Sequence, residues 1–140
     1  MTRIGLVGCS ATKLDRPAPA RELYVSPLFV KASAYAEATC QRWYVLSAKH
    51  GLVKPDQVLE PYDVALAANG LDWYSHIGHQ LQLELRGVQD PHLVVLAGTF
   101  YRKFLYPYCQ WPFTIPMKGM GIGQQLAWLS NELRAVAAAS

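Results

Sequence analysis

Short apolar runs alternate along this chain with segments in which apolar residues recur at helical spacing. Three runs are clear and end in small or polar residues, whereas a fourth is weaker. The runs are Ile4–Gly8, Trp43–Ser47, His92–Ala97 and Gln110–Phe113. Continuous apolar runs of this length, bounded by turn residues, are typical of buried parallel strands. The pattern predicts four strands, with the last at an edge of the sheet.

The intervening segments predict helices. Ser26 and Pro27 introduce the first, because serine is a common N-cap and proline suits the first helical position. The expected helices run from Leu28 to about Arg42, Asp72 to about Arg86, Gly98 to about Leu105 and Gly123 to about Ala138. This order is typical of parallel strands joined by helical crossovers. We therefore expect a single domain, residues 1–140, with a three-layer α/β/α fold and a four-stranded, mainly parallel sheet.

The composition is that of a folded domain. Hydrophobic residues make up 51% of the chain, which is too many for a disordered protein. No apolar stretch reaches the ~20 residues that a membrane-spanning helix needs. The start of the chain lacks the hydrophobic region and cleavage site of a signal peptide. We therefore expect a cytoplasmic protein without a membrane partner.

The charge bears on possible partners, and the cysteine content bears on disulfides and metal sites. The formal net charge of +3 permits a polyanionic partner, but the basic residues are spread out along the chain. Cys9, Cys40 and Cys109 cannot all pair within one chain and show no CxxC spacing. The sequence therefore predicts neither a disulfide framework nor a zinc site. No other metal-ligand spacing stands out, so we expect no metal and no cofactor.

The turns that follow the strands are the expected place for chemistry, because parallel strands bring their carboxyl ends to one edge of a sheet. The first turn contains Cys9, Ser10 and Lys13. Small residues beside a lysine favour an anion. The phosphate-binding pattern GxxxxGK[ST] is absent, which argues against hydrolysis of a nucleoside triphosphate. A tight turn with a solvated lysine is the structural alternative.

Two later turns are also rich in glycine. Gly98 follows the third run, and the segment from Lys118 to Gln124 opens the last helix. Glycines at a helix N-terminus favour an anion such as a phosphate, here near Gly121. Gln124 can read an amide or a base edge. Helix entry alone is the alternative explanation of this segment.

The turn after the second run carries the most polar chemistry. Lys49 and His50 follow at once, and Asp56, Glu60 and Asp63 come later in a long connection that we expect to pack over the strand ends. Cleavage of an N-glycosidic bond passes through an oxocarbenium-like state. A carboxylate stabilises that cation and orients water, while a cation or donor assists the departing base. The alternative is a turn cap at Asp56, a solvated Glu60 and a packed His50.

Aromatic residues lie in or near these turns, where they can stack on a nucleobase. Core packing is the more frequent use of any single aromatic residue. Arg102 and Lys103 directly follow one of them and could contact phosphates from this edge. The aromatic residues are Tyr24, Tyr62, Phe100, Tyr101 and Trp111.

Several strings of the sequence resemble a family of small bacterial and phage proteins that carry a domain of unknown function. They are Cys9-Ser10 with Lys13, Pro19-Ala20 with Leu23-Tyr24, Ser26–Phe29, Leu46–Leu52 and Glu60–Asp63, and the likeness continues to Gly121–Gln124. Members of this family are similar to DNA glycosylases that defend bacteria against phages with glucosylated cytosines. The segment from Gly51 to Tyr62 is also distantly similar to the peroxide-stress YaaA proteins, which bind DNA.

The order of strands and helices resembles the uracil-DNA glycosylase superfamily, whose core is a four-stranded parallel sheet flanked by helices. The chain departs from the motifs of that superfamily. The turn after the first strand has no water-activating aspartate, and no His-Pro-Ser follows the last strand. If the chain is such a glycosylase, its acid–base groups have moved, and His50, Asp56 and Asp63 are the residues we expect to carry them.

We therefore predict a DNA glycosylase that hydrolyses the N-glycosidic bond of a modified base in phage DNA, such as glucosylated hydroxymethylcytosine, and leaves an abasic site. Asp63 or Asp56 would stabilise the sugar cation, and His50 would assist the leaving base or bind a phosphate. Two alternatives stay open: a DNA-binding or nucleotide-sensing module, and a nucleoside hydrolase or deoxyribosyltransferase. The expected substrate-binding residues are Cys9, Ser10, Lys13, Tyr24, Lys49, Tyr62, Gly98, Tyr101, Gly121 and Gln124.

Overall fold

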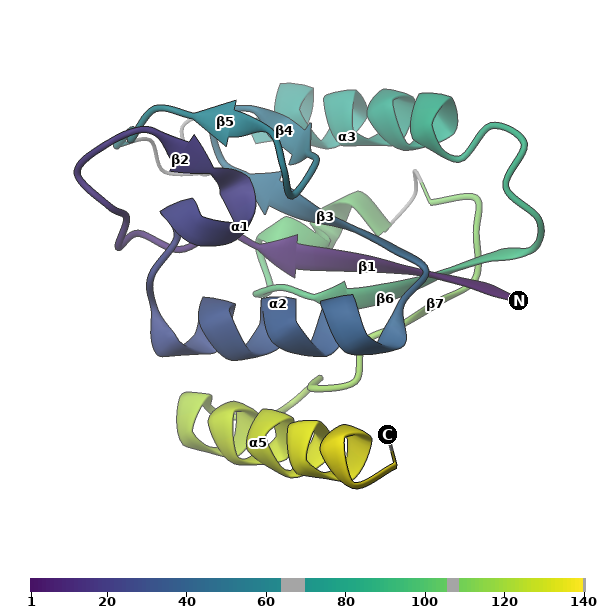
Figure 1. The fold of residues 1–140 in the computed structure, drawn as a ribbon. Helices are drawn as coiled ribbons and strands as arrows, with labels where there is room; N and C mark the ends of the chain where they lie inside the picture. Colours follow the sequence, from purple (N-terminus) through teal and green to yellow (C-terminus); the bar gives the residue numbers. More distant parts are fainter. Residues whose placement is uncertain (64–69, 106–108, 140) are drawn as a thin grey trace.

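The computed structural model describes residues 1–63, 70–105 and 109–139, and a five-stranded sheet forms its centre (Figure 1). The strands are β1 Thr2–Gly8, β3 Arg42–Ser47, β4 Gly51–Val53, β6 Pro91–Leu96 and β7 Phe113–Thr114. Their order in the sheet is β4-β3-β1-β6-β7. The central strand β1 pairs in parallel with β3 and β6, and β7 lies parallel to β6. Only β4 is antiparallel to its neighbour among these described strands.

The expected four-stranded sheet is therefore wrong by one strand. The four predicted strands are present, although the last is reduced to Phe113–Thr114. The added strand, β4, reverses direction after a short turn and pairs with the end of β3. Gly51 begins it with a φ of 76°, a left-handed conformation that glycine adopts readily. Three residues are too few to produce a recognisable hydrophobic period, so the sequence pattern does not reveal this strand.

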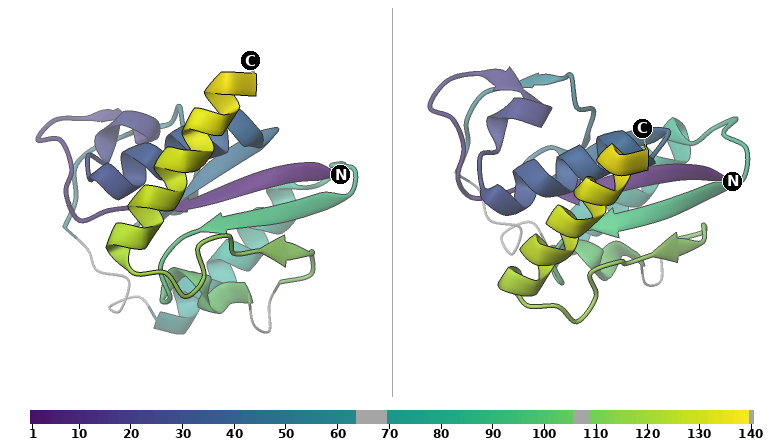
Figure 2. Two further views of the ribbon diagram at one scale, coloured as in Figure 1. Left: turned by 90° about the horizontal axis from the view of Figure 1, so that it is seen from below. Right: turned by 60° about the horizontal axis from the view of Figure 1, so that its bottom comes forward.

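Helices cover both faces of the sheet (Figures 1 and 2). One face carries α2, Pro27–Thr39, with α5, Ile122–Ala139, packed beside it, and the other carries α3, Gly70–Glu84. These three helices were predicted from the spacing of their apolar residues, with ends that differ by a few residues. The fold is mixed α/β, as expected. The closer likeness to uracil-DNA glycosylases stays a prediction.

The start of α2 and the segment after β6 test two local predictions. The Oγ of Ser26 accepts a hydrogen bond from the Phe29 N–H at 3.2 Å, and Pro27 takes the first helical position, so the predicted N-cap is confirmed. The helix expected from Gly98 is instead a 3₁₀ helix, η2, Tyr101–Phe104. Such short helices are common connectors between longer elements.

A small ribbon organises the long segments before α2 and after β4. It consists of β2, Ala18–Pro19, and β5, Val58–Leu59, which pair antiparallel, while α1, Ala20–Leu23, follows β2 directly. Backbone hydrogen bonds also join α1 to the stretch before β5, from the Ala20 N–H to the Gln57 carbonyl at 2.9 Å and from the Arg21 N–H to the Pro55 carbonyl at 2.9 Å. These pairings order the first part of the connection that the sequence predicts to be packed.

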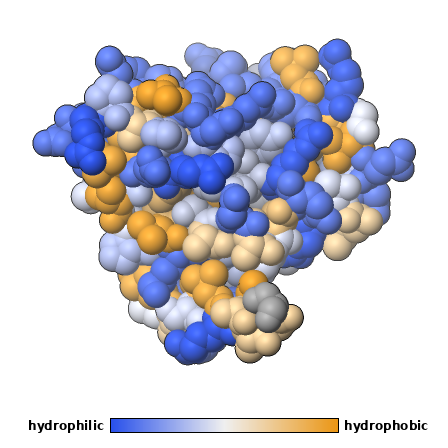
Figure 3. Space-filling model, in the orientation of Figure 1, coloured by the Kyte–Doolittle hydropathy of each residue, from blue (hydrophilic) through white to orange (hydrophobic). Residues whose placement is uncertain are grey.

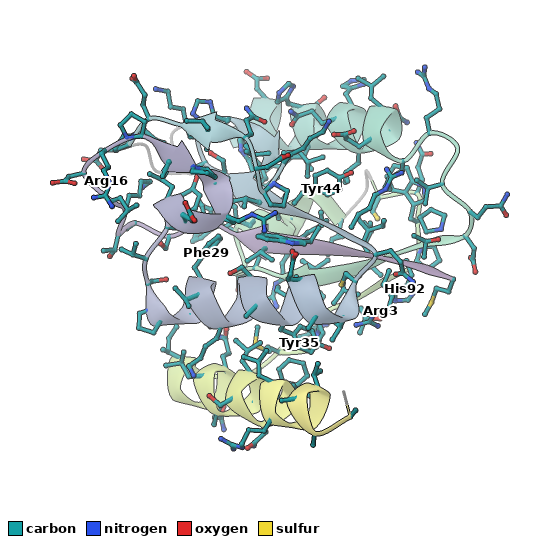
Figure 4. All side chains as sticks on the ribbon, viewed as in Figure 1. Arg3, Arg16, Phe29, Tyr35, Tyr44 and His92 are labelled. Atoms are coloured by element: carbon teal, nitrogen blue, oxygen red, sulfur yellow. The ribbon has the colours of Figure 1, made fainter. Side chains whose placement is uncertain are left out.

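Each face of the sheet buries its own apolar cluster. Along β1, Val7 belongs to the cluster under α2 and α5, whereas Ile4 and Leu6 belong to the cluster under α3. Figure 4 shows Phe29 between α2 and the sheet and Tyr35 between α2 and α5. Tyr35 packs edge-on against Trp128 with ring centroids 5.2 Å apart. The alternation along the strand thus anchors helices on both sides.

Gly5 permits the close approach of α2 to the middle of the sheet. A Cβ at this position would lie 3.0 Å from the Cβ of Ala36 in α2 and 3.0 Å from the Cβ of Trp43 in β3. Carbon atoms in favourable contact are separated by about 3.5–4.0 Å. The absence of a side chain at Gly5 therefore allows the short distance between α2 and the sheet.

The outer edge of β4 is occupied by a side chain of α3. Gln80 accepts a hydrogen bond from the Leu52 N–H at 2.8 Å, and its amide nitrogen donates to the Leu52 carbonyl at 3.3 Å. Both outward-facing backbone groups of Leu52 are thereby satisfied, as they would be by a further strand.

The surface in the view of Figure 3 is mixed in character. Hydrophilic side chains cover most of its upper part, and apolar side chains gather over α2 and α5 below. Within the described ranges, none of the helices combines the length and the apolar character needed to cross a bilayer.

Candidate functional site

The carboxyl ends of β1 and β6 open into a pocket. Because both strands run in the same direction, the residues that follow them, Cys9 and Ser10 after β1 and Ala97 and Gly98 after β6, lie together at one edge of the sheet. They line a pocket of about 260 Å³. Its position agrees with the general rule that open α/β sheets bind ligands beyond the carboxyl ends of their strands.

The walls of this pocket come from four further segments. They are α2 and the loop before α5, which contribute apolar side chains, and η2 and α5, which contribute polar ones. The pocket is therefore apolar over most of its lining, with a few polar groups, as is usual for sites that bind small organic groups. The additional lining residues are Gly8, Ser26, Leu28, Phe29, Ala32, Leu96, Tyr101, Met117, Ile122 and Gln125.

Cys9 connects the pocket to β3 and to η2. Its N–H donates to the Leu46 carbonyl of β3 at 3.0 Å, which fixes the backbone of the turn. Its Sγ lies 3.1 Å from the hydroxyl of Tyr101. The Tyr101 ring stands edge-on to Trp73 of α3 with centroids 5.6 Å apart. The predicted residues Cys9 and Tyr101 are thus brought together from positions 92 residues apart in the sequence.

A chain of hydroxyl groups adjoins Cys9. The Tyr62 hydroxyl lies 2.7 Å from Ser47 Oγ at the end of β3 and 2.6 Å from the Tyr24 hydroxyl. Ser47 Oγ also accepts a hydrogen bond from the His50 N–H at 3.1 Å. Ser47 is fully buried, and its carbonyl accepts from the Trp73 indole at 2.8 Å. The chain therefore ties the loop that carries Tyr62 to the end of β3.

Basic side chains surround the Tyr62 ring. The Lys13 ammonium lies 4.4 Å from the centre of that ring, and the His50 ring stands edge-on to it at 5.4 Å. Backbone pairing between Lys13 and Tyr24 holds the first turn in this place. A cation within about 6 Å of an aromatic face is attracted to it. Lys49 is exposed beside His50.

Burial keeps the three tyrosines of this edge protonated. Burial raises the pKa of Tyr62 and of Tyr101, and the negative charge of an ionised Cys9 nearby raises both further. Burial also raises the pKa of Tyr24. At neutral pH each phenol therefore keeps its proton and can donate a hydrogen bond.

His50 is shifted in the opposite sense. Burial lowers its pKa, and the adjacent charge of Lys49 lowers the pKa further. The imidazole is therefore uncharged at neutral pH. One ring nitrogen donates a hydrogen bond and the other accepts one.

A second pocket of about 210 Å³ adjoins the first. The two share Ala97, Gly98, Met117 and Gln125. The remaining lining residues of the second are Val95, Thr99, Arg102, Ile115, Gly119 and Met120, which makes its lining the more polar of the two. Gln125 is oriented by a hydrogen bond from its amide nitrogen to the Met120 carbonyl at 2.9 Å.

Gln125 rather than Gln124 lines the pockets. The Gln124 side chain is exposed and accepts a hydrogen bond from the Gly121 N–H at 2.9 Å, which closes the first turn of α5. The Gly121 N–H that the sequence offers to an anion is therefore already satisfied. A shift of one position changes the direction of a helical side chain by about 100°. The sequence therefore indicates a glutamine at this site but does not show which of the two adjacent glutamines points inward.

The predicted catalytic carboxylates occupy different places. Asp63 is exposed and follows Tyr62 directly, so the hydroxyl chain holds its backbone near the carboxyl edge. Asp56 lies beside Arg42, the first residue of β3, and hence toward the opposite end of that strand. The structure does not bring Asp56 to the pocket, because β4 runs antiparallel to β3 and carries the chain back along it. Glu60 is exposed.

The described residues contain no cluster of three or more histidine, cysteine or acidic side chains arranged to hold a metal ion. The polar groups that converge at the edge are instead phenols, hydroxyls, a thiol and basic side chains. Such groups bind and orient a polar organic ligand by hydrogen bonds and charge.

Comparison with known proteins assigns the chain to a family. Residues 4–131 match the family of unknown function DUF6884, and the chain belongs to this family. The chain is also 28% identical over 135 residues to the uncharacterized protein YfjM of Bacillus subtilis (strain 168). That match covers 86% of this chain and 89% of YfjM. The similarity therefore extends over the sheet and the pocket alike.

Proposed function

For this member of a family of unknown function, we propose that the pocket at the carboxyl edge binds a nucleobase and that the protein is a DNA glycosylase. It hydrolyses the bond between a modified base and its deoxyribose and leaves an abasic site. A base carrying an added group, such as glucosylated hydroxymethylcytosine in phage DNA, is the proposed substrate. The base must leave the DNA stack to reach such a pocket, as it does in other enzymes that act on bases.

The observation that carries this proposal is the pocket beside Cys9 and Tyr101. Its volume of about 260 Å³ is slightly below the roughly 300–1,000 Å³ of pockets that hold drug-sized ligands, which suits the pyrimidine ring of the proposed base. Phe29 and Met117 supply apolar surface for a planar ring. The Tyr101 phenol keeps its proton because burial raises its pKa, and it offers a hydrogen bond to the base.

The groups around Tyr62 support the chemical step. In hydrolysis, the bond from C1′ to the base nitrogen breaks, and the oxygen of water bonds to C1′. Asp63 carries a negative charge next to the anchored Tyr62, so we assign it the stabilisation of the sugar cation and the acceptance of the proton from water. The neutral imidazole of His50 donates a hydrogen bond to the departing base, which finally takes up a proton from solvent.

Base release tests this proposal. The protein is incubated with genomic DNAs that carry different cytosine and thymine modifications, and abasic sites and free bases are measured. We expect one modified DNA to lose its base. Asp63→Asn should lower the rate by about 10²–10⁴-fold, since removal of an acid–base group has effects of this size. Asp56→Asn is the matched control and should retain activity, because Asp56 lies at the other end of β3.

The outcomes separate the alternatives. Release from free modified nucleosides, with none from DNA, would identify a nucleoside hydrolase. Salt-dependent DNA binding without release of any base would identify a binding module. Equal losses in Asp63→Asn and Asp56→Asn would remove the assigned role of Asp63.

A further inference from the structure

The second pocket has the composition of a site for an anion. Arg102 lines it together with Thr99 and Gly98 after β6 and Gly119 in the loop before α5. Of the described residues that line either pocket, none is acidic. Lys118 lies next to Gly119 in the sequence and adds a positive charge to the same loop.

Arg102 is held in place by an uncharged partner. Its Nη2 donates to Thr99 Oγ1 at 3.1 Å, and within the described ranges no carboxylate lies close enough to form an ion pair with it. The side chain is half-buried. A guanidinium has five N–H donors in a planar arrangement that matches the oxygens of a phosphate. Among the described residues, Thr99 Oγ1 is the one side-chain acceptor for these donors, and the other donors can meet an anion in the pocket.

The position of this pocket ties it to the first. Gly98 and Gln125 line both, so the two pockets adjoin each other. The first pocket is mainly apolar and the second mainly polar. A nucleotide has the same division, because its base is planar and largely apolar on its faces whereas its phosphate is anionic.

We propose that the second pocket binds a phosphate group of the substrate through Arg102 while the base occupies the first. This inference rests on the proposed function, which it deepens by naming the group that fixes the nucleotide. The phosphate has two possible sources, a free nucleotide or the DNA backbone. Contacts to phosphate position a nucleic acid without reading its sequence.

Binding measurements test the assignment without any need for bond cleavage. Isothermal titration is performed with 2′-deoxycytidine, its 5′- and 3′-monophosphates and a single-stranded pentadeoxynucleotide with cytosine at its centre. We expect at least one phosphate-bearing probe to bind about 10-fold or more tightly than deoxycytidine, as charge-assisted hydrogen bonds allow. Arg102→Gln should abolish this advantage and leave the affinity for deoxycytidine unchanged.

Lys103→Gln is the matched control. It removes the same charge one residue further on, but Lys103 is exposed, lies 4.8 Å from the centre of the Phe100 ring and does not line the pocket. It should retain the phosphate advantage. Arg102→Lys keeps the charge and should retain part of it, which guards against an effect of Arg102→Gln on folding.

The outcomes are distinct from those of the base-release assay. An advantage confined to the pentadeoxynucleotide identifies the DNA backbone as the source, and an advantage of a monophosphate identifies a nucleotide end. The proposal is overturned by equal affinities for phosphate-bearing and phosphate-free probes, by undetectable binding of all probes or by equal effects of Arg102→Gln and Lys103→Gln. A protein that releases no base but shows Arg102-dependent binding would refute only the glycosylase activity.

Discussion

At the scale of single residues, Tyr62 joins more of the site than any neighbour described above. Its hydroxyl is the middle member of the chain from Ser47 to Tyr24, and its ring contacts both Lys13 and His50. Loss of this one hydroxyl removes the hydrogen bonds that Tyr62 makes with Ser47 Oγ and with the Tyr24 hydroxyl. Loss of the Tyr24 hydroxyl leaves the hydrogen bond between Tyr62 and Ser47 in place.

The buried tyrosines make stability dependent on alkaline pH. Burial raises the pKa of Tyr24, Tyr62 and Tyr101 in the folded protein, whereas the unfolded chain ionises near the usual value of about 10. Their contribution to the free energy of unfolding is therefore complete below about pH 10 and declines as the pH rises above it. We expect the urea midpoint to fall progressively as the pH rises above about 10.

Two variants complete this prediction. Tyr62→Phe should lower the free energy of unfolding at pH 8 by about 1–3 kcal/mol and make the alkaline decline shallower, since one titrating group is removed. Tyr24→Phe should cost less at pH 8, because Tyr62 keeps its hydrogen bond with Ser47 Oγ in that variant. Urea titrations at several pH values measure both effects. Parallel pH curves for wild type and Tyr62→Phe would contradict the assignment.

The residues of the site were partly predictable from the sequence. Cys9 follows β1 directly, and Gly98 and Tyr101 lie in the segment after β6, so the rule about strand ends brings all three to this edge. The same rule led us to expect Asp56 at this edge. The structure places it elsewhere, because β4 turns back along β3 and the rule about strand ends does not account for such a reversal. Ser47 and Gln125 reveal their roles only through the direction of their side chains, which depends on the packed fold.

At the scale of elements, the contact between β1 and α2 depends on the missing side chain of Gly5. Gly5→Ala places a Cβ 3.0 Å from two backbone-proximal carbons, and neither neighbour is a flexible side-chain end. We expect a loss of about 1–3 kcal/mol, as is usual for overpacking in a core. Urea denaturation measures this loss.

Gly123→Ala is the matched control for the same chemical change. A Cβ at Gly123 would meet no atom within 4 Å, and the residue lies near the start of α5. Alanine is favoured over glycine in helices by about 0.5–1 kcal/mol. The control should therefore be neutral or stabilising. A stable Gly5→Ala variant would show that α2 can move away from β1 without cost.

The long elements were predictable and the short ones were not. The helices α2, α3 and α5 each span several turns, so their apolar spacing repeats often enough to be recognised. By contrast, β2 and β5 contain two residues each and exist through their mutual pairing. Their partners are about 40 residues apart in sequence, a relation that local patterns do not encode.

At the scale of the whole molecule, β1 is common to both apolar clusters. Ile77 of α3 and Leu129 of α5 are each fully buried on opposite faces. We expect Ile77→Ala and Leu129→Ala each to lower the free energy of unfolding by about 2–5 kcal/mol. Because the faces share a central strand, unfolding should remain a single transition in both variants.

Far-UV circular dichroism and tryptophan fluorescence measure this cooperativity. The fluorescence sums Trp73 and Trp111 on the α3 face and Trp43 and Trp128 on the α2 and α5 face, so it follows both faces together. The circular dichroism signal and the fluorescence signal should change at the same urea concentration in wild type and in both variants. Transitions that separate in either variant would show that the layers unfold independently.

The carboxamide of Gln80 has a consequence for association between copies of the chain. An open strand edge is a template on which another molecule can add a strand, which is a common route to aggregation. Gln80 occupies both outward-facing backbone groups of Leu52 and so takes the place of such an incoming strand. Growth of the sheet beyond β4 is thereby blocked by a single side chain of the protein itself.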